Sequence, residues 1–207
     1  MGSKRTLGVV LFDGFELLDV FGPLEMFGLA ADHFEIRLIS ESGGVVASRQ
    51  GPKSICDDSF QSAPAIDVLL VPGGIGTRRE VDNQVLLDWI KERSEQAELV
   101  ASVCTGSALL AEAGVLDGLR ATSNKLAFAW ASSQSKKVQW QKQARWVEDG
   151  KFFSSSGVSA GIDMSLAVIA KLVSQQAAEQ AATFAEYDWH RDANWDPFAA
   201  LHGLVGD

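Results

Sequence analysis

Short apolar segments alternate with longer helical segments along most of the chain. The runs 6–12, 66–72 and 99–103 are almost wholly apolar and of strand length, which is typical of strands buried on both faces. The segment 34–40 alternates apolar and polar residues, as a further strand does. Helices are predicted between and after these strands, over 83–96, 157–173 and 174–189, and 16–31 is predicted to be a turn followed by a helix. Strands separated by helices pair in parallel, so the pattern predicts a three-layer α/β/α sandwich with a mostly parallel central sheet.

The segments outside this alternation predict turns and hairpins. Glycines open a hairpin-rich stretch over 43–59, and 138–153 suggests strands around a turn at Asp149-Gly150. Pro23 follows Gly22 and suits the first position of the first helix, where a missing N–H removes no hydrogen bond.

Composition and charge narrow the class of protein. The chain has 207 residues, of which 46% are hydrophobic and 22% charged, so we expect one folded domain over 1–207, with a helical and aromatic-rich tail from about 174. The net charge is −9 and no basic stripe occurs, so we expect no nucleic-acid partner. The first apolar run is too short for a signal sequence or membrane span, so we expect no membrane partner and a cytoplasmic location.

Cys104 is the candidate nucleophile. It follows the apolar run 99–103 and precedes a small-residue helical run, Gly106-Ser-Ala-Leu-Leu. A strand-to-helix turn pushes a nucleophile out of the backbone toward solvent, and the helix start favours an anion there. We therefore expect a lowered thiol pKa. The alternative is a buried small hydrophobe. The other cysteine, Cys56, lies in the hairpin stretch and is expected to be structural, and no cluster with metal-ligand spacing occurs.

Chemistry in open α/β sheets gathers beyond the carboxyl ends of the strands. The segment after the first strand carries Asp13, Glu16 and Asp19. Asp19 stands among Leu17, Leu18 and Val20, and burial there would raise its pKa toward neutrality and suit it to acid–base work. The residues alone leave a helix-capping aspartate equally plausible. Glu16 is the second candidate acid, and Asp13-Gly14 is more simply a turn.

Glycines follow the next buried strand, in Pro72-Gly73-Gly74-Ile75-Gly76. Backbone N–H groups at Gly73 and Gly74, with that of Thr105, would suit an oxyanion hole beside the thiol. The element lacks a full dinucleotide-binding fingerprint, and a tight turn after the strand explains it as well.

Five motifs together resemble the ThiJ/PfpI superfamily. They lie at 11–23, 67–74, 102–107, 113–122 and 156–163. The Cys104-Thr-Gly-Ser elbow and the Leu18-Asp-x-x-Gly-Pro element most resemble the isocyanide hydratase branch. The resemblance implies a flavodoxin-like sandwich, a cysteine nucleophile, a homodimer, and neither metal nor organic cofactor. It also favours Asp19 over Glu16 as the acid–base residue.

The chain departs from the family pattern at several positions. Thr105 follows the cysteine where protease-like members carry histidine, and Asn124 stands where hydratase-like relatives often have histidine. The three histidines, at 33, 190 and 202, lie outside the motif segments, which argues against a peptidase. The tail 188–198 also differs. Fused regulators of the superfamily carry an added helix-turn-helix domain, for which we expect no room here.

The aromatic residues are assigned to packing. We expect Trp189, Trp195 and Phe198 to pack the tail on the sandwich, with a dimer interface or pocket cover as the alternative. Core packing is expected for the remaining tryptophans considered, Trp130, Trp140 and Trp146.

The resemblance and the elbow together suggest a small-molecule hydro-lyase. Cys104 would attack the terminal carbon of an isocyanide, with Asp19 exchanging protons and Thr105 helping to hold polar atoms, to give an N-formamide. Two alternatives remain open at this point. One is glyoxalase or deglycase chemistry on small α-oxoaldehydes, and the other is a non-catalytic redox-sensing stress protein in which Cys104 is oxidised.

Overall fold

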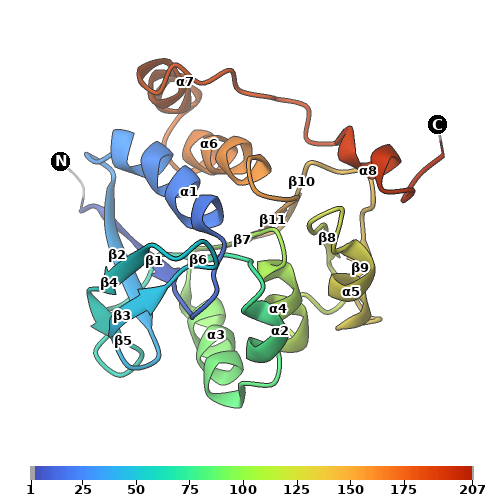
Figure 1. Ribbon diagram of the computed structural model, residues 1–207. Helices are drawn as coiled ribbons and strands as arrows, with labels where there is room; N and C mark the ends of the chain where they lie inside the picture. The colour runs from blue at the N-terminus through green and yellow to red at the C-terminus, as the bar shows by residue number, and fades with distance from the viewer. Residues whose placement is uncertain (1–2, 207) are drawn as a thin grey trace.

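A seven-stranded sheet forms the centre of the protein. The computed structural model describes residues 3–206. The strand order is β10-β11-β7-β6-β1-β2-β5, and every pair is parallel except β10 with β11 (Figure 1). The strands are β1 Arg5–Val10, β2 Phe34–Ser40, β5 Asp58–Ser59, β6 Val68–Val71, β7 Leu99–Val103, β10 Trp146–Asp149 and β11 Phe152–Ser155. The expected mostly parallel α/β/α sandwich is confirmed.

Helices cover both faces of this sheet. In Figure 1, α1, α6 and α7 lie on one side, and α2, α3 and α4 lie on the other. The helices are α1 Leu17–Leu29, α2 Thr77–Glu80, α3 Gln84–Gln96, α4 Gly106–Glu112, α5 Phe128–Ser133, α6 Ala160–Leu172, α7 Gln175–Phe184 and α8 Phe198–Leu201. Both faces are covered, so the two central strands β6 and β7 are buried at every position.

Two small sheets stand apart from the central one. Strands β3 Gly44–Ala47 and β4 Lys53–Cys56 pair antiparallel, which confirms the hairpin expected over 43–59. The short strands β8 Arg120–Ala121 and β9 Gln139–Trp140 pair in parallel. The turn at Asp149-Gly150 joins β10 to β11, as predicted.

The first helix differs from its prediction. Helix α1 begins at Leu17, so Pro23 lies inside it and not at its first position. A proline at this position has no N–H to donate to the carbonyl of Asp19, four residues back, so helix propensity disfavours a proline inside a helix. Packing of α1 on α6 compensates. A Cβ at Gly22 would stand only 2.8 Å from Ile162 Cγ1, so glycine allows this close approach.

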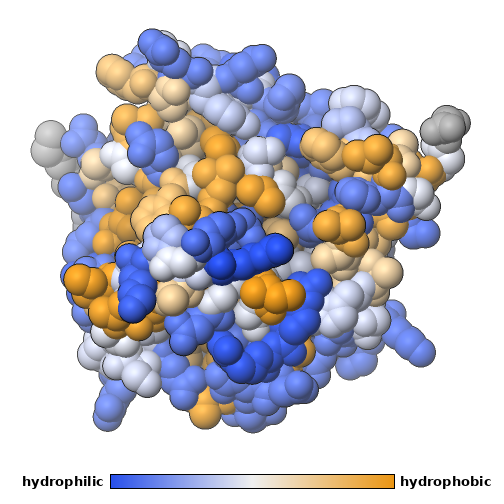
Figure 2. Space-filling model, in the orientation of Figure 1, coloured by the Kyte–Doolittle hydropathy of each residue, from blue (hydrophilic) through white to orange (hydrophobic). Residues whose placement is uncertain are grey.

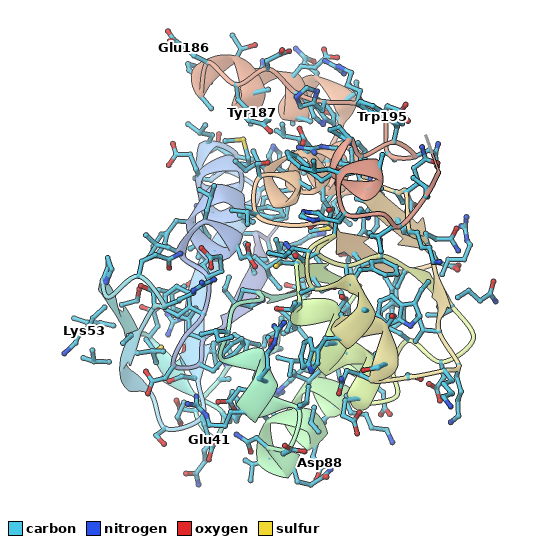
Figure 3. The ribbon with its side chains drawn as sticks, turned by 45° about the vertical axis from the view of Figure 1, so that its right-hand side comes forward. Glu41, Lys53, Asp88, Glu186, Tyr187 and Trp195 are labelled. Atoms are coloured by element: carbon cyan, nitrogen blue, oxygen red, sulfur yellow. The ribbon has the colours of Figure 1, made fainter. Side chains whose placement is uncertain are left out.

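The tail after α6 is less helical than predicted. Helix α7 ends at Phe184, and Glu186 has a φ of +48°, so the chain leaves the helix before 189. The following segment crosses toward α8, and Figure 3 labels Tyr187 and Trp195 on it. A buried ion pair anchors this segment. Asp163 Oδ2 pairs with Arg145 Nη2 at 2.6 Å, and Asp163 Oδ1 accepts hydrogen bonds from the Tyr187 hydroxyl and the His190 N–H.

The aromatic residues divide between packing and exposure. Trp189 packs against the core and Trp146 is buried, as expected. Trp195 and Phe198 are about half exposed, at 54% and 48%, so the expectation that they pack on the sandwich is wrong. Figure 2 shows hydrophobic residues gathered over α1 and over the region of α5 and α8, with strongly hydrophilic residues across the middle of the face. Within residues 3–206, no helix is long and apolar enough to cross a membrane.

Candidate active site

Cys104 stands on a strained turn between β7 and α4. Its φ is +58°, a left-handed conformation that non-glycine residues rarely adopt. The surrounding chain holds this conformation in place. Its N–H donates to the carbonyls of Ser155 and Ser156, and its own carbonyl accepts from the hydroxyls of Ser107 and Ser123 at 3.0 Å each. The predicted strand-to-helix elbow is therefore present.

Asp19 lies in the first turn of α1 and is completely buried. Its Oδ2 accepts a hydrogen bond of 3.0 Å from the Gly73 N–H, and its Oδ1 has no hydrogen-bond partner in the described part of the chain. Burial raises the pKa of this carboxyl to about 7, against the opposing effects of the Gly73 N–H and the Cys104 thiol. The nearby charge of Glu16 raises it further. The residue predicted to titrate near neutrality does so.

The thiol of Cys104 departs from its prediction. The side chain is only 7% exposed, and burial together with the charge of Asp19 raises its pKa well above the usual range. Hydrogen bonds from the backbone and side chain of Thr105 oppose this but do not outweigh it. The expectation of a solvent-facing thiol with a lowered pKa is therefore wrong. Cys104 and Asp19 instead form a buried pair that carries two protons below about pH 7 and keeps the thiol proton above it.

The glycine loop after β6 brings Asp19 and Thr105 together. A Cβ at Gly73 would stand 2.5 Å from Thr105 N and 2.9 Å from Asp19 Oδ2, so only glycine fits between them. Gly74 has a φ of +124°, and its N–H donates to Thr105 Oγ1 at 3.1 Å. The Gly73 and Gly74 N–H groups, two of the three predicted oxyanion donors, are thus already hydrogen-bonded within the protein. The third, the Thr105 N–H, is directed at the thiol.

Glu16 caps α1 beside this pair without joining it. Its backbone N–H donates to the Gly73 carbonyl, and its carboxylate contacts Gln50 and lies 3.7 Å from Arg49 Nη1. Among residues 3–206 the Glu16 side chain makes no hydrogen bond to Cys104 or Asp19, although it lines the same cavity as the thiol. A role as second-rank acid stays a prediction.

A cavity of about 630 Å³ opens onto Cys104 and Thr105. Its wall combines charged and apolar side chains and includes Asn124, whose Oδ1 accepts the Ala127 N–H at 2.9 Å. Trp130 also lines the cavity, so its assignment to core packing is wrong. The other lining residues are Glu16, Arg49, Gly74, Ile75, Arg78, Leu126, Ala127, Ala129 and Val158.

Sequence reasoning missed the two arginines of this cavity, Arg49 and Arg78. Arg78 follows the glycine loop by only two residues, and this proximity was the available signal. Val158 was missed too, although it adopts a φ of +48° at the cavity wall, which is strained for a β-branched residue. Across residues 3–206, no group of three or more histidine, cysteine, aspartate or glutamate side chains could hold a metal ion.

Comparison with known proteins places this site in a family. The isonitrile hydratase of Pseudomonas putida is 32% identical over 181 residues, which cover 87% of this chain and 78% of that protein. The transcriptional regulator CdhR of Pseudomonas aeruginosa is 30% identical over 83% of this chain but only 52% of its own length. A deglycase of Pyrococcus abyssi is 30% identical over 54% of this chain and 67% of its own.

Solved structures and the family model agree with these relatives. A ThiJ/PfpI family protein from Pseudomonas syringae superposes with a TM-score of 0.80 at 30% identity, over 90% of this chain and 76% of that one. The model of the DJ-1/PfpI family matches residues 5–171, which include Asp19, the glycine loop and Cys104. The chain belongs to the DJ-1/PfpI family.

Proposed function

We propose that the protein hydrates isocyanides to N-formamides through a covalent thioimidate on Cys104. The observation that carries the proposal is the buried Cys104–Asp19 pair, which places a nucleophile beside a carboxyl of pKa about 7. Such a carboxyl exchanges protons readily at neutral pH. Similarity to an isonitrile hydratase over most of the chain supports the same chemistry.

The first half-reaction needs one nucleophile and one proton. The thiol proton passes to Asp19 as the sulfur attacks the terminal carbon of the isocyanide, and Asp19 then protonates that carbon. A C–S and a C–H bond form, giving a thioimidate with a C=N bond. The raised thiol pKa makes a preformed thiolate scarce, so proton transfer to Asp19 accompanies attack.

The second half-reaction consumes one water. Asp19, again ionised, takes a proton from water as the oxygen adds to the thioimidate carbon, and passes this proton to the nitrogen. The C–S bond then breaks as the remaining hydroxyl proton passes through Asp19 to sulfur, which releases the N-formamide and restores the thiol. The Thr105 N–H stabilises negative charge on sulfur in both halves. The net reaction adds one water to one isocyanide.

The test is hydration of a simple aryl isocyanide by the wild type and three variants. Cys104→Ala should abolish turnover while keeping the fold, and Cys104→Ser should be strongly impaired. Cys56→Ala is the matched control, because Cys56 is also a free buried cysteine but lies on β4. Mass spectrometry of quenched wild-type protein should detect the thioimidate adduct on Cys104. Wild-type turnover by Cys104→Ala would disprove the mechanism.

Activity on α-oxoaldehydes is the second candidate, because a deglycase is among the relatives. The same thiol would add to a carbonyl carbon, with Asp19 as base. Parallel assays with an isocyanide and with methylglyoxal separate the two activities. Redox sensing is less favoured, because burial and a raised pKa both reduce the thiolate that peroxide attacks.

A homodimer is part of the proposal. Leu18, Phe21 and Leu29 on α1 are 37–41% exposed, and an apolar helix face of this kind suits a contact with a second copy. Light scattering on the purified protein should give twice the 22.2 kDa mass of the chain. A mass of one chain at micromolar concentration would refute this assembly.

A further inference from the structure

The cavity beside Cys104 holds more positive than negative charge at its wall. It is lined by Arg49, Arg78 and one carboxylate, Glu16. Glu16 lies 3.7 Å from Arg49, which accounts for one of the two cations. Across residues 3–206, Arg78 has no carboxylate within 4 Å, and its hydrogen bond goes from Nη1 to the neutral Thr77 hydroxyl. The guanidinium of Arg78 is therefore uncompensated, although the chain as a whole carries a net charge of −9.

Arg78 is also held in a defined position. It lies on α2, and its guanidinium stacks over the Trp130 ring at 3.8 Å from the ring centre. Partial burial lowers its pKa, the thiolate form of Cys104 raises it, and the neighbouring charge of Arg49 lowers it further. A cation stacked on an aromatic ring loses little conformational entropy when it binds a ligand. These properties describe an anion-binding group, whose planar donors match a carboxylate.

Apolar side chains complete the wall around this cation. Leu126 and Ile75 are 78% and 54% exposed, and with Trp130 they offer a surface for an uncharged hydrocarbon body. A ligand with a reactive carbon at one end and an anionic group at the other matches the arrangement of thiol, apolar wall and guanidinium.

We propose that Arg78 binds a carboxylate of the substrate, so that this site prefers isocyanides that carry a carboxylate. The inference rests on the proposed function, which it extends from a reaction to a substrate class. Arg78 contacts the substrate's charged group and takes no part in bond formation. Its removal should therefore change selectivity between charged and neutral substrates.

The experiment compares two substrates of nearly equal shape, 4-isocyanobenzoate and 4-isocyanobenzamide. Wild-type protein should hydrate the carboxylate with a kcat/KM about 10- to 100-fold higher, as expected for a charge-assisted hydrogen bond. Arg78→Gln should abolish this preference, mainly by raising KM for the carboxylate. Arg78→Lys should keep part of it. Arg79→Gln is the matched control, because Arg79 lies on the same helix but pairs with Glu80 outside the cavity wall.

A different result would reveal a different role. If Arg78 only stabilised the thiolate, Arg78→Gln would slow both substrates equally, and the proposal would be wrong. Equal rates on both substrates in the wild type would also overturn it, while leaving isocyanide hydration intact.

Binding without turnover tests the same point independently. Calorimetry with 4-formamidobenzoate and 4-formamidobenzamide, the two products, should show about tenfold or tighter binding of the carboxylate to Cys104→Ala. The preference should vanish in Cys104→Ala/Arg78→Gln. If neither isocyanide is hydrated, the proposed function fails, and this measurement still decides whether Arg78 binds a carboxylate. Equal binding of the two products would refute that role.

Discussion

The backbone N–H of Gly73 donates a 3.0 Å hydrogen bond to Asp19 Oδ2, across 54 positions of the sequence. The other carboxyl oxygen, Oδ1, is buried without a hydrogen-bond partner among the described residues. The ionised form of a carboxyl group is unfavourable in an apolar environment when only one of its oxygens accepts a hydrogen bond, so the group holds its proton tightly. This half-satisfied state explains how an aspartate can act as an acid near neutral pH beside the Cys104 thiol.

Replacement of Asp19 by asparagine tests the acid–base role. Asp19→Asn keeps an acceptor for the Gly73 N–H but cannot exchange a proton. We expect kcat/KM to fall by about 10²–10⁴-fold on an isocyanide. Glu16→Gln is the matched control and should be much milder, because Glu16 contacts Gln50 and Arg49 and not the thiol. A collapsed rate in Glu16→Gln with a near-normal rate in Asp19→Asn would transfer the role to Glu16.

The pH–rate profile should report the coupled pair. The mechanism requires one proton shared between Cys104 and Asp19, and below about pH 7 the pair carries two. The kcat/KM should therefore rise about tenfold per pH unit below 7 and level off above it. Asp19→Asn should lose this rise in its residual activity. A wild-type rate that is independent of pH between 5 and 7 contradicts the assignment.

Stability should depend on pH through the same carboxyl. The folded protein holds the Asp19 proton up to about pH 7, while the unfolded chain releases it near 3.8. Between these values the folded state binds more protons, so this group's contribution to stability is present at low pH and is lost as pH rises toward 7. The total loss is about 4 kcal/mol at most.

Asp19→Asn removes this dependence. Urea unfolding at pH 5 and pH 8 should show the stability of the variant improving relative to wild type by about 2–3 kcal/mol over that interval. An unchanged difference between the two proteins would show that Asp19 titrates alike in the folded and unfolded states.

The close approach at Gly73 predicts an intolerant glycine. Gly73→Ala should cost both activity and stability, because its Cβ would overlap Thr105 N and Asp19 Oδ2. Gly28→Ala is the control, since Gly28 lies exposed in α1 with nothing within 4 Å of an added Cβ. It should stabilise the protein by about 0.5–1 kcal/mol with full activity. Thermal melts and kinetics decide, and normal kinetics in Gly73→Ala would refute the tight fit.

The tail depends on the buried pair of Arg145 with Asp163. Arg145→Met leaves a buried, uncompensated carboxylate and should cost about 3–5 kcal/mol in urea unfolding. Arg191→Met breaks the exposed pair with Glu179 at 3.3 Å and should cost under about 1 kcal/mol. Similar losses in the two variants would mean that the buried pair contributes no more than a surface one.

Local patterning was sufficient for the sandwich and for the elbow. Apolar runs of strand length define β1, β6 and β7 because strands buried on both faces have few polar positions. The strand-to-helix change at Cys104 is equally local, so the turn was predictable. The raised pKa predicted for Asp19 is confirmed, but its sequence neighbours do not account for the burial, because Leu18 is itself 41% exposed and the Asp19 carboxyl lies against the distant Gly73. Local rules failed for Pro23, where packing of α1 on α6 outweighs the helix-breaking tendency of proline.

Tertiary structure decided the electrostatics of the site. The sequence predicted a lowered thiol pKa from the helix start. The fold instead buries Cys104 and places it beside Asp19, which is 85 positions away in the sequence, and both effects raise the thiol pKa. The stack of Arg78 on Trp130 and the engagement of the Gly73 and Gly74 N–H groups likewise join segments that no local pattern connects. Secondary structure follows from near neighbours in sequence, whereas solvation, charge pairing and cavity shape depend on which distant segments the fold brings into contact.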